Sequence, residues 1–128
     1  MLTNNSASVY RQSLNKTFIN ALNGIQYFFK TERNGKIQAA ISTFVLLAGF
    51  YLKLSALEWI LVLLCIGAVL ALEMLNSALE HLCNLVHSEY HPVIKFIKDV
   101  AAGAVLLGSL ISAIIGSIIF IPKILLLL

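Results

Sequence analysis

The feature that most constrains this chain is an uncharged apolar run, residues 59–72, that leads directly into a polar stretch beginning at Glu73. A run of this kind predicts a helix within a membrane. At about 100° per residue, four polar side chains fall on one narrow face of that helix: Glu73, Asn76, Glu80 and Asn84. A carboxylate that faces lipid is costly, so such residues normally face a protein interior or water and have a function there. We therefore expect this face to line a polar site.

The composition is typical of a membrane protein and excludes an ordinary soluble domain. Of the 128 residues, 59% are hydrophobic and 12% are charged, and the mean hydropathy is +0.90. The net charge of +3 comes from 9 basic residues that form no dense cluster. Anionic lipid headgroups are therefore expected partners and nucleic acid is not. A single domain of this size has few helices to enclose a polar site, so we expect an oligomer.

The hydrophobic pattern predicts an all-α membrane protein with one interfacial helix and three membrane helices. Residues 1–8 are expected to form a flexible tail. Residues 9–33 are expected to form an amphipathic helix in the membrane interface, because apolar residues recur there every three to four positions. Membrane helices are expected at 37–54, 56–86 and 93–121. Their boundaries are marked by Asn34-Gly35, by Ser55 with Glu58 as a capping box, and by Pro92 and Pro122.

Two cysteines, Cys65 and Cys83, lie in the same predicted helix. They are about five turns apart, which is too far for them to pair within one straight helix. We expect both to be small buried residues and to form no disulfide.

The basic residues predict the orientation of the chain in the membrane. Only Lys53 and Lys123 fall on one side, and the other side carries Arg11, Lys16, Lys30, Arg33, Lys36, Lys95 and Lys98. The positive-inside rule then places the N-terminus and the polar site at the cytoplasmic face.

Several polar residues of this face are suited to phosphoryl transfer. Glu32 and Glu80 offer carboxylates for Mg²⁺, which takes one or two of them together with substrate phosphates. Lys98 is suited to neutralise phosphate charge, and Glu73, deeper in the membrane, to act as a general base toward a lipid hydroxyl. The sequence contains neither a P-loop pattern nor the protein-kinase motifs. Spacing alone therefore predicts only a polar site in an oligomeric membrane protein.

A different function remains open at this point, that of a small oligomeric membrane transporter with Glu73 as its carrier carboxylate. Glu80, Lys98 and Asp99 gather at one membrane interface rather than at the midplane, which argues against a transporter. An inactive structural membrane protein is a third possibility.

Five segments stand out as motifs. Glu73-Met-Leu-Asn76-Ser77-Ala78-Leu-Glu80 is followed by Ser88-Glu89-Tyr90-His91 and by Lys98-Asp99-Val-Ala-Ala-Gly-Ala-Val105-Leu. Earlier in the chain stand Lys30-Thr-Glu32-Arg33-Asn34 and Ala-Gly-Phe-Tyr-Leu-Lys-Leu-Ser-Ala-Leu-Glu-Trp59. The first three resemble, in order and spacing, the prokaryotic diacylglycerol kinase family, whose signature is E-x-x-N-[ST]-A-[IL]-E. The other two look like its undecaprenol-kinase branch, and the resemblance covers about residues 17–123.

The resemblance implies a homotrimer of small subunits with composite active sites at the cytoplasmic face of the bacterial cytoplasmic membrane. The implied activity is the phosphorylation of diacylglycerol or undecaprenol by ATP with Mg²⁺. By motif position, Glu73 is implied to be the general base, and Glu32 and Glu80 are implied to bind the metal. The implied nucleotide-binding residues are Glu32, Asn76, Glu80, Glu89, Tyr90, His91, Lys98 and Asp99.

Three further residues are weaker candidates for contact with the lipid substrate: Asn23, Gln26 and Ala102. Asn23 and Gln26 lie on the first predicted helix, where a solvent-exposed polar face explains them equally well. For Ala102 the alternative is packing between helices.

One position departs from the family pattern, because Asn84 stands where the family usually has Asp. Asparagine keeps the size and the hydrogen bonding but loses a charge. Two consequences of Asn84 remain open: it weakens the binding of metal or ATP, or it is a tolerated variant. The lipid is open too, since diacylglycerol and undecaprenol both present a primary hydroxyl. The segment from Lys30 to Asn34 favours a long polyprenol.

Overall fold

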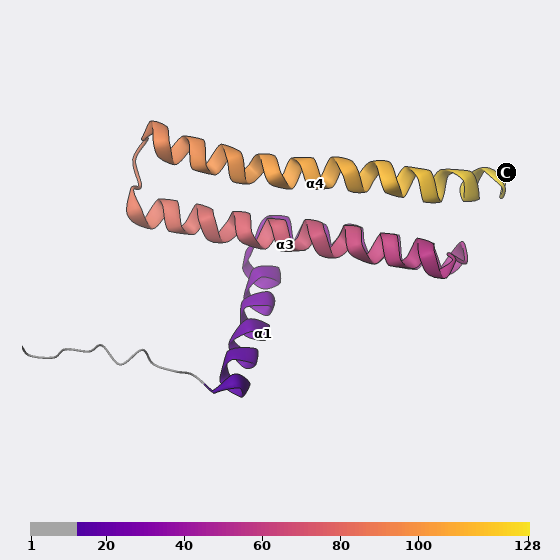
Figure 1. Ribbon diagram of the computed structural model, residues 1–128, viewed down its shortest axis with the longest axis horizontal. Coiled ribbons are helices and arrows are strands. Elements are labelled where there is room, and N and C mark those ends of the chain that lie inside the picture. The colour runs from indigo at the N-terminus through magenta and orange to yellow at the C-terminus, as the bar shows by residue number, and fades with distance from the viewer. Residues whose placement is uncertain (1–12) are drawn as a thin grey trace, which may run out of the picture.

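In the computed structural model, residues 13–128 are described, and they form four α-helices and no strand. The helices are α1 (Leu14–Thr31), α2 (Arg33–Tyr51), α3 (Ala56–Val86) and α4 (Pro92–Leu125). The long helices α3 and α4 lie side by side and antiparallel, whereas α1 leaves them at a steep angle (Figure 1). The all-α prediction is therefore confirmed. The predicted tail and the predicted first turn of the 9–33 helix lie outside the described residues.

The start of α3 follows from its local sequence. Ser55 Oγ accepts a hydrogen bond from the backbone N–H of Glu58 over 3.2 Å. The Glu58 carboxylate in turn accepts from the backbone N–H of Ser55 over 2.8 Å. These two bonds form the predicted capping box and satisfy backbone donors that have no partner within the helix. A Lys123 Nζ to Glu58 Oε2 ion pair, 3.1 Å, joins this end of α3 to the end of α4.

The predicted polar break between the first two helices, over residues 31–36, is present, but it falls at Glu32 and not at Asn34-Gly35. Glu32 has an extended backbone (φ −87°, ψ 127°), which separates α1 from α2. The N–H of Lys36 already bonds the carbonyl of Glu32 over 3.2 Å, so α2 begins at Arg33 rather than at residue 37. Gly35 is needed for close approach instead, since a Cβ there would lie 2.9 Å from the ring of Phe28.

The ends of α2 and α4 also differ from the expected 54 and 121. Lys53 has a left-handed backbone (φ 54°), and α2 already ends at Tyr51. In α4, Pro122 lies inside the helix, which continues to Leu125. Proline lacks a backbone donor, but its carbonyl still accepts from the N–H of Leu126 over 3.2 Å, so the last turn of the helix continues. The start of α4 differs by one residue from the expected residue 93. It is Pro92, which occupies the first helical position.

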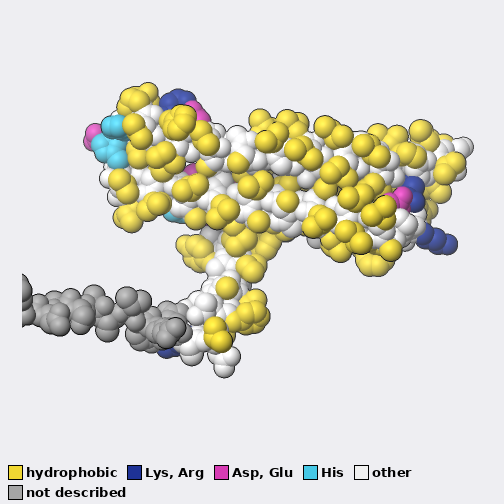
Figure 2. Space-filling view, viewed as in Figure 1, with side chains coloured by type: hydrophobic (Ala, Val, Ile, Leu, Met, Phe, Trp, Pro, Cys, Tyr) yellow, Lys and Arg dark blue, Asp and Glu magenta, His cyan; other side chains and the backbone are white. Residues whose placement is uncertain are grey.

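The packed interior is small and most apolar side chains face outward. Leu54, Val62 and Ile119 form the buried core, with Trp59 packed against it. Hydrophobic side chains cover the length of α3 and α4, and charged side chains gather toward the two ends of this pair (Figure 2). Within residues 13–128, α3 and α4 are long and apolar enough to cross a membrane. The third predicted membrane helix, α2, is not one of them and stays a prediction.

Both cysteines are free, as predicted. Cys83 is buried, whereas Cys65 is only half-buried.

Candidate active site

The polar face predicted on α3 exists, and its deepest members are buried. Glu73 is 5% exposed, and the neighbouring Asn76 and Ser77 are 6% and 8% exposed. Glu73 Oε2 accepts a hydrogen bond from Asn34 Nδ2 on α2 over 3.3 Å. A buried carboxylate needs such a donor, because a charge without a partner is costly away from water. Sequence reasoning gave Asn34 no role in the site, although it stands only two residues from Glu32.

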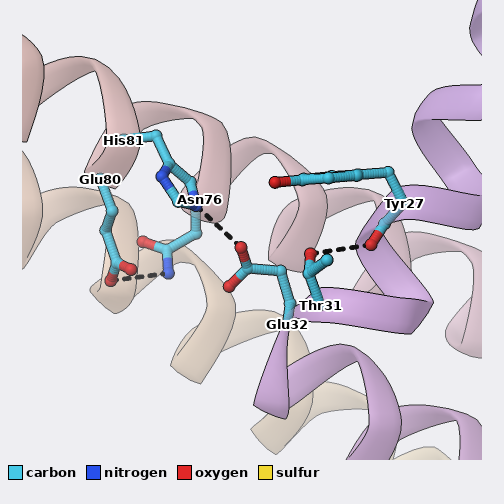
Figure 3. A network of polar contacts seen from close by, with 6 residues as sticks. All are labelled: Tyr27, Thr31, Glu32, Asn76, Glu80 and His81. Carbon is cyan, nitrogen blue, oxygen red and sulfur yellow. Dashed lines mark hydrogen bonds and ion pairs between the residues drawn. The ribbon is translucent and has the colours of Figure 1, made fainter.

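One turn farther along α3, Asn76 Nδ2 donates a hydrogen bond to Glu80 Oε1 over 3.3 Å. The other amide atom, Asn76 Oδ1, is buried without a partner. At the α1–α2 junction, Glu32 Oε1 lies 2.8 Å from His81 Nε2. Figure 3 shows Glu32, Asn76, Glu80 and His81 gathered in one polar network, with the amide of Asn76 beside the carboxylate of Glu80. Sequence reasoning missed His81, because it is on a different face of α3 from Glu80.

The oxygen atoms of this network fit a hard cation such as Mg²⁺. Buried polar atoms normally have partners, so the buried Asn76 Oδ1 is suited to a ligand. Carboxylate and amide oxygens are the donors that Mg²⁺ takes, together with water and substrate phosphates. Within residues 13–128, no group of three His, Cys, Asp or Glu side chains is placed to hold a metal by itself. A cation here would therefore depend on oxygen atoms from a phosphate ligand as well.

A second polar region lies at the turn between α3 and α4, around a cavity of about 330 Å³. Its lining includes five of the predicted nucleotide-binding residues: Glu89, Tyr90, His91, Lys98 and Asp99. The turn into α4 is held by His91, whose Nδ1 accepts from the N–H of Val93 over 3.1 Å. The structure thus brings these five residues together.

The two lysines of this cavity have different partners. Lys95 forms an ion pair with Asp99, one turn away on α4. Lys98 Nζ instead donates to the neutral Oδ1 of Asn84 on α3 over 2.6 Å. The charge of Lys98 is therefore not cancelled by this neighbour, and Lys98 is suited to attract a phosphate.

The contacts made by the polar face of α3 run in sequence along the helix. Glu73 bonds Asn34, Asn76 bonds Glu80, and Asn84 bonds Lys98. The face therefore links the buried carboxylate to the cavity at the α3–α4 turn. Outside it, the candidate lipid contacts Asn23, Gln26 and Ala102 are exposed side chains, and their role stays a prediction.

The chain matches known proteins over most of its length. The model of the family described as "Prokaryotic diacylglycerol kinase" matches residues 19–120. The chain is 44% identical over 117 residues to an undecaprenol kinase of Bacillus subtilis, covering 89% of this chain and 95% of that one. It is 38% identical over 103 residues to a diacylglycerol kinase of Synechocystis, covering 80% and 59%. With a diacylglycerol kinase of Haemophilus influenzae it shares 29% identity over 101 residues, covering 78% and 86%.

Proposed function

We propose that this chain, which belongs to the prokaryotic diacylglycerol kinase family and is a lipid kinase, phosphorylates undecaprenol or a similar long prenol with ATP. The observation that carries the catalytic part is the buried Glu73, held by Asn34 on the face that leads to the Lys98 cavity. The choice of prenol is supported by the similarity to the Bacillus subtilis undecaprenol kinase over nearly its full length. Family membership also sets aside the alternative of a transporter.

In the proposed reaction, Glu73 is the general base. Its Oε2 holds the amide of Asn34, and we assign the other oxygen, Oε1, to the hydroxyl of the lipid. As the hydroxyl oxygen forms its bond to the γ-phosphorus, the bond from that phosphorus to the β–γ bridging oxygen breaks and ADP leaves. The hydroxyl proton passes to the Glu73 carboxylate. The products are a lipid monophosphate and ADP.

The nucleotide is proposed to lie between the two polar regions. Glu32, Glu80 and the unpaired Oδ1 of Asn76 would hold Mg²⁺ against the phosphates. The positive charge that Mg²⁺ supplies when bound offsets the charge of the triphosphate. Lys98 adds a cation from the opposite helix. The remaining nucleotide contacts are assigned to the cavity residues Glu89, Tyr90, His91 and Asp99.

The proposed setting is the bacterial cytoplasmic membrane, with the N-terminus and the site at the cytoplasmic face. In this arrangement residues 1–128 form one domain in which α2, α3 and α4 cross the membrane and α1 lies in the interface. The steep angle between α1 and the α3–α4 pair supports an interfacial α1. A homotrimer with composite sites completes the proposal. Among the described residues no large side chain is fully buried, which leaves apolar surface for lipid and other subunits.

The test is phosphate transfer from labelled ATP, with Mg²⁺, by purified protein in detergent. Undecaprenol and diacylglycerol are offered side by side, and Glu73→Gln serves as the inactive control because it keeps the shape but removes the base. Transfer to undecaprenol in preference to diacylglycerol, lost in Glu73→Gln, supports the proposal. A clear preference for diacylglycerol would overturn the choice of lipid. No transfer to either lipid by the folded wild-type protein would overturn both assigned acceptors.

A further inference from the structure

The lining of the cavity at the α3–α4 turn includes a charged residue to which the proposed function gives no role, Lys95. Its Nζ donates to Oδ2 of Asp99, one turn farther along α4. Figure 2 shows basic, acidic and histidine side chains close together at this end of the α3–α4 pair. Lys95 therefore belongs to the polar region assigned to the nucleotide and contacts one of its assigned residues.

The stability of α4 does not explain a lysine at this position. Lys95 lies in the first turn of α4, three residues after Pro92. The N-terminus of a helix carries partial positive charge, so a cation in the first turn is unfavourable. A lysine four positions before an acidic residue is also the weaker order for an ion pair on a helix. Because the Lys95 and Asp99 side chains are both more than half exposed, their ion pair contributes little to folding.

The charges of the cavity favour a role in binding an anion instead. Two lysines, Lys95 and Lys98, balance the two carboxylates of Glu89 and Asp99. Without Lys95 the fixed charges of these side chains would be negative in sum, and a cavity of that sign repels a nucleoside triphosphate. Lys95 offsets the charge of Asp99, whereas Lys98 bonds a neutral amide and keeps its charge for the phosphates.

We infer that Lys95 is a positioning residue for the nucleotide and acts through Asp99. Lys95 engages Oδ2, so it sets the rotation of the carboxylate and leaves Oδ1 to accept a hydrogen bond from the nucleotide. The donor is a hydroxyl or amino group of the nucleoside, because phosphate oxygens are acceptors. This inference rests on the proposed function, and it adds the residue that allows an acidic side chain to take part in binding an anionic ligand.

Two lysine-to-methionine variants form a matched pair. Lys95→Met keeps an unbranched side chain and a similar helix propensity, but it removes the charge and the donor. Lys30 is an exposed lysine in the last turn of α1 and is not part of the cavity lining. Lys30→Met is therefore the control for the loss of one positive charge elsewhere. Lys95→Arg is the conservative variant, which keeps both the charge and a donor for Asp99.

The dissociation constant of ATP, with Mg²⁺, is measured on the full-length protein in detergent by isothermal titration calorimetry. We expect Lys95→Met to raise it roughly fivefold, because the cavity loses a positive charge and Asp99 loses its partner. Lys95→Arg and Lys30→Met should bind ATP like the wild type. Unchanged ATP binding in Lys95→Met, or an equal loss in Lys30→Met, would refute the inference.

Two readouts separate positioning from a merely structural ion pair. With saturating ATP, kcat of Lys95→Met should equal that of the wild type, because only nucleotide binding is weakened. The Tm of Lys95→Met should be equal to that of the wild type or slightly higher, since the variant removes a cation from the first turn of a helix. A lower Tm together with a lower kcat would mean that Lys95 serves the fold, against the inference.

The path through Asp99 is tested in the Asp99→Asn background, which keeps an amide oxygen as the acceptor and so still binds ATP. There Lys95→Met should weaken ATP binding only about twofold, because only the general attraction between the lysine and the phosphates is lost. An undiminished fivefold loss would show that Lys95 contacts the nucleotide itself, and the inference would be wrong.

Phosphate transfer to undecaprenol, measured on the same samples, distinguishes this inference from the proposed function. Transfer by the wild type, with ATP binding unchanged in Lys95→Met, means that the inference is wrong and the proposed function stands. Weaker ATP binding in Lys95→Met, without transfer by the wild type, means that Lys95 acts as inferred but the assigned acceptor is wrong.

Discussion

Asn34 on α2 donates a hydrogen bond from Nδ2 to Oε2 of Glu73 on α3 over 3.3 Å, across 39 positions of the chain. The bond ties the N-terminal turn of α2 to the one buried carboxylate of the described residues. Because it engages Oε2, it sets the rotation of the carboxylate and so the direction in which Oε1 faces. Asn34 is thus placed to position the proposed base without touching the reacting atoms.

We expect Asn34→Ala to lower kcat by about tenfold, since a hydrogen bond to a charged group contributes roughly 1.5–3 kcal/mol. The KM for ATP should change little, because Asn34 is not part of the cavity at the α3–α4 turn. Steady-state kinetics with undecaprenol measures both constants. Asn34→Asp is the companion variant, which has the same size but no amide donor. If Asn34→Asp were fully active, shape rather than hydrogen bonding would explain the role of Asn34.

The contact between Lys98 and Asn84 gives a second prediction. Asn84→Asp would turn the 2.6 Å hydrogen bond into an ion pair and partly cancel the charge available to phosphate. We expect the KM for ATP to rise a few-fold at low salt, since exposed ion pairs contribute about 0.2–1 kcal/mol. The difference should fade as the salt concentration is raised. A lower KM in Asn84→Asp would contradict this view and would indicate that an acidic residue is useful here for metal binding.

The third prediction concerns the close contact between α1 and α2. A Cβ on Gly35 would lie 2.9 Å from the Phe28 ring and 3.0 Å from the Phe28 carbonyl oxygen. The backbone atom cannot swing away as a side chain can, so Gly35→Ala should destabilise the protein by about 1–3 kcal/mol. Gly24→Ala is the matched control on α1, where a Cβ meets nothing within 4 Å. Thermal unfolding in detergent should show a lower Tm for Gly35→Ala and an equal or higher Tm for Gly24→Ala.

Sequence periodicity predicted the polar face of α3 because a helix repeats its faces at a constant angle. The partners of that face depend on how α2 and α4 pack, and periodicity within one helix does not contain this information. Asn34 was therefore missed as the partner of Glu73, and His81 as the partner of Glu32. The start of α2 was mispredicted for a related reason. Asn34-Gly35 is typical of a turn, but the tertiary contact with Phe28 requires a glycine within the helix.

The pair formed by Glu32 and His81 gives the last prediction. Glu32 Oε1 lies 2.8 Å from His81 Nε2, and the exposed fraction is 24% for the Glu32 side chain and 67% for His81. If Glu32 binds Mg²⁺, Glu32→Gln removes a charged ligand and should raise the Mg²⁺ concentration for half-maximal activity by roughly tenfold or more. His81→Ala removes only a neighbour of that ligand, so its effect should be smaller. Magnesium titrations of both variants, made with saturating ATP, decide the question. Equal shifts in the two variants, or no shift in Glu32→Gln, would show that Glu32 is not a metal ligand.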